Sequence, residues 1–106
     1  MTYTDTQLKQ ALAKMLPPNL IVWYRNPQFP SQAALRYCNN GAEVLDTELL
    51  HLCWLVEVAL TAEQWNDYVG YIMVDTHSIF TYEHLLHATW QQRTIALAKV
   101  KGIEIV

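Results

Sequence analysis

Apolar and polar positions repeat with a helical period along much of this chain, and three capping boxes mark where helices begin. In each box a threonine precedes a glutamine by three residues, so that the Thr hydroxyl and the Gln amide can each satisfy a free backbone N–H. The boxes are Thr4–Gln7, Thr61–Gln64 and Thr89–Gln92. They predict three amphipathic helices, the last of which runs to about Lys101 and ends at Gly102 in a left-handed conformation.

The first helix has one apolar stripe and a clear stop. The stripe consists of Leu8, Ala11, Leu12 and Met15. Pro17-Pro18 ends the helix, because proline donates no backbone hydrogen bond and forces the preceding residue out of the α region. The apolar run Leu20–Tyr24 is rich in strand formers and predicts a buried strand.

The segment 31–45 fits two structures. Asn40-Gly41 lies between two apolar stretches, Ala33–Cys38 and Ala42–Leu45, which is typical of a hairpin. Alternatively, Ser31 caps a short helix that ends near Gly41. We favour the strands.

The residues from Glu48 to about Leu60 predict a helix that is apolar nearly all round, and we expect it in the middle of the core. The helix after Thr61 has the stripe Trp65, Tyr68, Val69 and Ile72. Gly70 inside that helix suggests close packing or an early end.

Three further segments complete the prediction. We expect a connector at Val74–Ile79 and a short strand at Ile103–Ile105. Phe80–His87 is expected to form either a short helix or a strand. The chain is therefore expected to be α+β, a mainly helical single domain over residues 1–106, with helices packed on a small sheet of two to four short strands.

Composition adds a hint about partners. Of the 106 residues 52% are hydrophobic and only 16% are charged, against about 25% in typical domains. Either some apolar surface is covered by a partner or a second copy, or the hydrophobic core is large for a domain of this size. The net charge of −3 gives no field that would attract nucleic acid or an anionic membrane.

The charges are unevenly distributed. No Lys or Arg occurs between Tyr37 and Gln92, where eight carboxylates fall, whereas the basic residues lie in the flanks. Either the flanks fold back beside the acidic middle, or one face stays acidic and meets a basic partner. We favour the first, because packing brings chain ends together.

The two cysteines, Cys38 and Cys53, make no disulfide framework. The N-terminus lacks the pattern of a signal peptide, and the longest apolar run, Leu52–Leu60, contains Glu57 and is far shorter than a membrane span. We expect a cytoplasmic protein with both thiols free and buried.

Little in the sequence points to catalysis. His84 and His87 are three apart and could share one edge of a metal site, but no further ligand pair completes it. Glu63 and Asp67 are like charges four residues apart, which is typical of the solvent-exposed face of a helix. The sequence has no Gly-rich loop of the kind that binds phosphate groups. We therefore expect no enzyme, no metal and no cofactor.

Aromatic residues exceed what the core of so small a domain easily absorbs. Tyr and Trp are common anchors of protein interfaces. The interface candidates are Trp65, Tyr68, Tyr71, Tyr82 and Trp90.

The middle and end of the chain resemble a group of short phage and prophage proteins, some akin to the phage ABA-sandwich domain. The resemblance rests on three patches, Asp46–His51, Leu60–Gln64 with Tyr68, and His87–Leu97. It covers roughly residues 46–102 and implies helices on a small sheet, with no activity attached.

Together these patterns predict a non-catalytic phage or mobile-element accessory protein that acts by protein–protein binding, as a homo-oligomer or on a host factor. The alternative is a small-ligand or metal-binding protein that uses the His84/His87 face.

Overall fold

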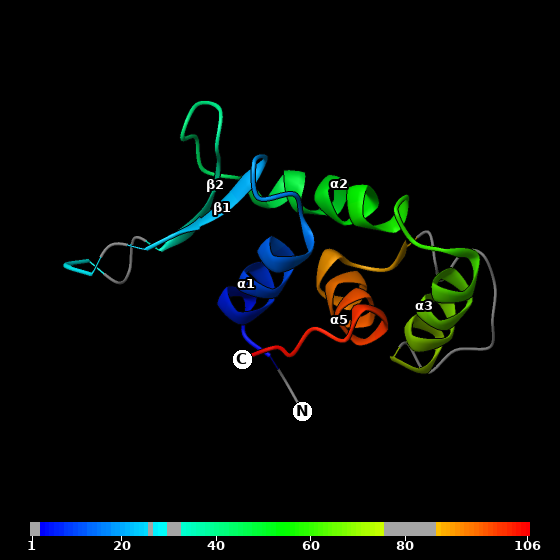
Figure 1. Ribbon diagram of the computed structural model, residues 1–106. Coiled ribbons are helices and arrows are strands. Elements are labelled where there is room, and N and C mark those ends of the chain that lie inside the picture. The colour runs from blue at the N-terminus through cyan, green and yellow to red at the C-terminus, as the bar shows by residue number, and fades with distance from the viewer. Residues whose placement is uncertain (1–2, 26, 30–32, 76–86) are drawn as a thin grey trace.

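The computed structural model describes residues 3–25, 27–29, 33–75 and 87–106. Within them the chain is α+β and mainly helical, as predicted (Figure 1). Its elements are α1 (Asp5–Met15), β1 (Ile21–Tyr24), β2 (Ala34–Tyr37), α2 (Asp46–Glu57), α3 (Ala62–Asp75) and α5 (Trp90–Lys101). The two alternatives for Phe80–His87 fall almost wholly outside the described residues.

The three predicted capping boxes are confirmed, and they share one geometry. The backbone N–H groups of Gln7, Gln64 and Gln92 each donate to the hydroxyl of the threonine three residues earlier at 3.2 Å. In return, each glutamine Oε1 accepts from that threonine's N–H at 2.8 to 3.0 Å. Local sequence alone therefore determines where α1, α3 and α5 begin.

The end of α5 also follows the prediction. Gly102 adopts φ 68°, which a residue without Cβ tolerates, and the Ile103 N–H donates to the Ala98 carbonyl at 2.8 Å. Ile103–Ile105 continues without forming the strand expected there. No neighbouring strand among the described residues is placed to pair with it.

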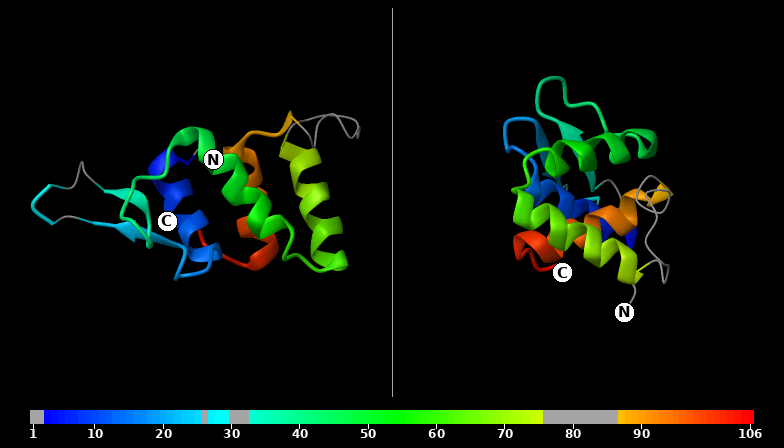
Figure 2. Two further views of the ribbon diagram at one scale, coloured as in Figure 1. Left: turned by 90° about the horizontal axis from the view of Figure 1, so that it is seen from above. Right: turned by 90° about the vertical axis from the view of Figure 1, so that its right-hand side faces the viewer.

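The central helix is α5, not α2. α5 packs against α1, α2 and α3, and Figures 1 and 2 show α1, α5 and α3 side by side with α2 lying across them. Buried small residues of α5, Thr94, Ala96 and Ala98, allow several helices to approach it closely. The prediction that the helix from Glu48 would occupy the middle of the core is wrong, because the described residues cover only one face of α2.

The sheet has two antiparallel strands, with Ile21 opposite Tyr37 and Trp23 opposite Leu35. The face of the sheet that carries Ile21 and Leu35 packs towards α1. On the other face, Val22 and Tyr24 are 47% and 40% exposed. β1 is therefore half-covered rather than buried, because no layer of the described residues lies on its outer face.

The strand interpretation of residues 31–45 is confirmed, but the pairing differs from a simple local hairpin. β2 pairs mainly with β1, and the turn at Asn40-Gly41 leads only to an isolated bridge between Arg36 and Glu43. Pairing with β1 places Ile21 and Leu35 in the core, and the segment after Gly41 adds the buried Val44, whose N–H donates to the Leu35 carbonyl at 2.9 Å.

Gly70 neither ends α3 nor marks a close approach. The helix continues to Asp75, beyond the predicted start of a connector at Val74. A Cβ placed on Gly70 would meet nothing within 4 Å. The prediction of close packing or an early end at this position is therefore wrong.

The basic flanks fold back onto the acidic middle of the chain. Lys9 of α1 lies 3.4 Å from Asp46, and Arg93 of α5 lies 2.7 Å from Glu57. The two pairs agree with interleaved charges rather than a wholly acidic face. No helix within the described residues has the length and hydropathy needed to cross a membrane.

Candidate functional site

The outward face of α2 carries a second apolar stripe, which we define as His51, Trp54, Leu55 and Val58. These positions follow the spacing i, i+3, i+4, i+7, so they line one side of the helix, Val58 as its C-terminal cap. Trp54 is 48% exposed, Leu55 37% and Val58 82%. Apolar side chains at this spacing are the usual anchors of a helix docked on another protein.

The buried face of α2 has the same spacing and points the other way. It consists of Leu49, Leu52, Cys53 and Val56, all within the core. At about 100° per residue, the centres of the two stripes lie on opposite sides of the helix. α2 is thus apolar towards the core and apolar away from it.

Two carboxylates of α2 accept hydrogen bonds from tyrosines of other elements. The Tyr37 hydroxyl of β2 donates to Glu48 at 2.5 Å, and the Tyr68 hydroxyl of α3 donates to Glu57. The bond from Tyr37 lowers the pKa of Glu48 and raises that of Tyr37 itself. The stripe itself therefore contains no carboxylate, and Glu48, which stays ionised because its pKa is lowered, lies one turn before His51.

His51 and Trp54 contact each other on this face. Their ring centroids lie 6.2 Å apart with an interplanar angle of 73°, an edge-on arrangement. The contact holds the large indole in place, which reduces the entropy lost when a partner covers it.

Glu57, Tyr68 and Arg93 form a buried cluster that joins three helices. The guanidinium of Arg93 donates to Glu57 at 2.7 Å and, through Nε, to the Ala88 carbonyl at 3.1 Å. The side chains of Arg93 and Glu57 are only 5% and 10% exposed. A buried pair of this kind is costly to break, so the cluster positions α2, α3 and α5 relative to one another.

The same cluster explains two pKa shifts. Burial foremost, then the hydrogen bond to Glu57, raises the pKa of Tyr68 above its ordinary value. Burial is the largest single influence on Arg93 and lowers its pKa, but the hydrogen bond to Glu57, the charge of Glu57 and the contact with Tyr68 together raise the pKa above its ordinary value. Both groups therefore keep their protons, and neither is suited to proton transfer near neutral pH.

The cysteines occupy different environments. Cys53 is buried, and burial raises the pKa of its thiol to about 11, which makes it a poor nucleophile. Cys38 is also free but exposed. The prediction of two buried thiols is correct for Cys53 and wrong for Cys38, because Cys38 follows β2 at the turn.

The predicted interface aromatics do not form one surface. Tyr68 is fully buried and belongs to the core. Its ring packs within the core cluster, and its hydroxyl donates to Glu57. Trp90, expected on an exposed first turn, is partly buried against the core. Tyr82 lies outside the described residues.

Trp65 and Tyr71 are exposed on α3, at 37% and 40%. Since they flank the buried stripe of Tyr68 and Ile72 on opposite sides, they do not share a face. Trp65 contacts the Tyr68 ring, and Tyr71 lies 5.4 Å from the ammonium of Lys99.

The two histidines of the alternative function are not both among the described residues. His84 lies outside the described residues, and His87 is exposed. Within the part of the chain that is described, no three His, Cys, Asp or Glu residues lie together as metal ligands.

Sequence reasoning missed the outward face of α2, although its signal was present. An apolar pattern all round predicts a central helix, whereas the second stripe of α2 lies at the surface.

The chain matches no family model, no characterised protein and no solved structure.

Proposed function

We propose that this protein is a non-catalytic binding module that associates with a second copy of itself through the outward face of α2. The observation that carries the proposal is the uncharged apolar stripe of His51, Trp54, Leu55 and Val58, directly opposite the helix's core face. A helix apolar on both sides is normally covered on both sides.

Charge favours a second copy as the occupant. The chain has a net charge of −3, so most surfaces of two copies repel each other. The stripe on the outward face of α2 adds nothing to this repulsion, since it contains no carboxylate. Two acids of the same helix are offset by cations, Asp46 by Lys9 and Glu57 by Arg93. A single uncharged stripe is also self-complementary about a two-fold axis.

The small size of the stripe limits the affinity expected for the dimer. A helix of 12 residues is about 18 Å long, so two crossed helices bury less than the roughly 800 Å² per partner of a standard interface. We expect a weak, concentration-dependent dimer with a dissociation constant in the micromolar range.

Sedimentation velocity over a concentration series tests the proposal. The wild type should sediment as a dimer at high concentration, and Val58→Lys should remain a monomer. Val58 is the helix cap, where a cation is favourable for the helix itself, so the variant should fold normally. Trp54→Glu provides a second variant.

Val22→Lys is the matched control, because it places the same charge on an exposed valine of the sheet. It should dimerise like the wild type. If the wild type is monomeric at every concentration, or if the two lysine variants behave alike, the proposal fails.

A further inference from the structure

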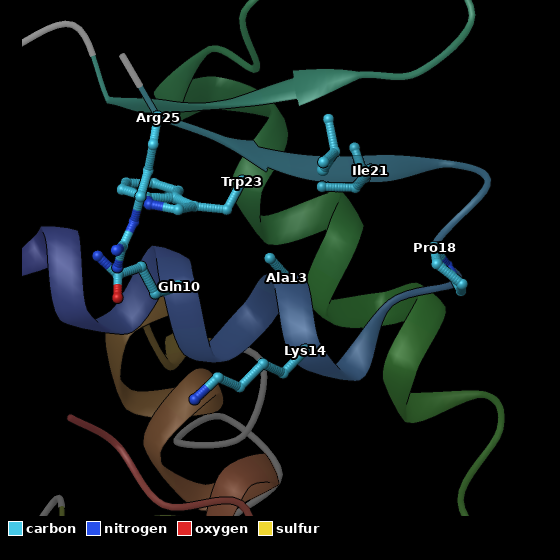
Figure 3. Close-up of a pocket in the computed structure, with 8 residues that line it drawn as sticks. Gln10, Ala13, Lys14, Pro18, Ile21, Trp23 and Arg25 are labelled. Carbon is cyan, nitrogen blue, oxygen red and sulfur yellow. The ribbon is translucent and has the colours of Figure 1, made fainter. Parts of the chain in front are cut away.

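A separate groove lies between α1 and β1, on the side of the sheet that faces the helices. It has a volume of about 420 Å³, within the range of small-molecule sites. Figure 3 shows the side chains that line it, among them Gln10, Ala13, Pro18, Ile21, Trp23 and Arg25.

The groove is apolar at one end and polar at the other. Pro18 and Ile21 lie towards one end with Ala13 between them and the opposite end, where Trp23, Gln10 and Arg25 come together (Figure 3). Arg25 extends from beyond the end of β1 towards the amide of Gln10. This arrangement suits a molecule that has an apolar body and one polar head.

The polar end has a donor without an acceptor. The indole Nε1 of Trp23 is buried and has no hydrogen-bond partner among the described residues. A buried N–H without an acceptor is unfavourable, because it has lost its bond to water without gaining another. Trp23 packs against the core and also lines the groove, so a molecule bound in the groove is in position to supply the acceptor.

Charge defines what that acceptor is. Among the described residues, the charged ones that line the groove are Arg25 and Lys14, and none is a carboxylate. Lys14 is exposed at the open side of α1. The polar end thus offers an indole N–H and a guanidinium, which together match an anionic oxygen.

We propose that this groove binds a small amphiphilic carboxylate. Its apolar body lies on Ala13, Pro18 and Ile21, and its carboxylate accepts from Trp23 and Arg25. The site involves none of the residues on the outward face of α2, so it stands independently of the proposed dimer.

Titration with naphthalene-2-carboxylate, followed by NMR, tests the site. The indole N–H signal of Trp23, assigned as the one absent from Trp23→Phe, should move downfield as it gains an acceptor. The neutral naphthalene-2-carboxamide has the same shape and should bind roughly tenfold more weakly, because it lacks the charge-assisted bonds. Inorganic phosphate, a head without a body, should bind more weakly than the carboxylate.

Arg25→Gln should abolish the preference for carboxylate over carboxamide, whereas Lys101→Gln, which removes the same charge from the end of α5, should preserve it. Val58→Lys should bind as the wild type does, which separates this site from the dimer. Equal affinity for the two naphthalene compounds, no binding of either, or shifts confined to Trp54 would overturn the proposal.

Discussion

The carboxylate of Glu57 and the guanidinium of Arg93 lie 2.7 Å apart, although 36 residues separate them in the chain. Arg93→Met should lower the free energy of unfolding by about 3–5 kcal/mol, because it leaves Glu57 buried without its cation. Urea denaturation measures the change. The double variant Glu57→Gln/Arg93→Met should cost less than the sum of the two single variants.

The exposed pair of Lys9 and Asp46 is the natural comparison. Lys9→Met should change stability by less than about 1 kcal/mol, because solvent screens such pairs. Additive costs for Glu57→Gln and Arg93→Met would show that the buried pair is not coupled.

Stability should decline in alkaline solution. Burial raises the pKa of Cys53 from 9.0 to about 11 and raises that of Tyr68 above 10.0. Between the unfolded and folded pKa values only the unfolded chain loses these protons, so the stabilisation is complete below pH 9 and is lost as pH rises towards the folded values.

Urea midpoints measured from pH 8 upwards should therefore fall beyond about pH 9. Tyr68→Phe should reduce the slope above about pH 10, whereas Tyr71→Phe, on the exposed side of α3, should not. Parallel curves for the wild type and Tyr68→Phe would contradict the assignment.

The two thiols should react at very different rates. At pH 8 Ellman's reagent should modify Cys38 quickly, since it is exposed, and leave Cys53 intact until the protein unfolds. Cys38→Ser should eliminate the fast phase. A fast phase that persists in that variant would mean that Cys53 is accessible.

Two glycine substitutions should have opposite signs. Gly70→Ala should stabilise the protein by about 1 kcal/mol, because alanine favours helix and its Cβ meets no atom within 4 Å. Gly102→Ala should destabilise it by about 1 kcal/mol, since φ is +68° there. Thermal unfolding of both variants provides the comparison, and a stabilised Gly102→Ala would refute the capping role.

The features that the sequence predicted well are local ones. Thr4, Thr61 and Thr89 each bond to atoms three residues away, so the start of a helix can be read from four letters. The ends at Pro17 and Gly102 are equally local, because they depend on the backbone of a single residue.

The features that it predicted poorly depend on which elements meet. The hydrophobic pattern of α2 cannot tell a central helix from one that is exposed on its second face, and the small residues of α5 gave no sign that it would be central. Glu57 interrupts an apolar run, which was the available hint of a buried partner. Neither Arg93 nor Tyr68 could be assigned to it, because that pairing needs the packing of three helices.

The central place of α5 has a consequence for the order of folding. Synthesis proceeds from the N-terminus, so α1, α2 and α3 emerge before the helix that all three pack against. Until α5 is made, their apolar faces have no common partner, and contacts such as Glu57–Arg93 cannot form. The three earlier helices therefore acquire their shared packing partner only after all of them have been synthesised.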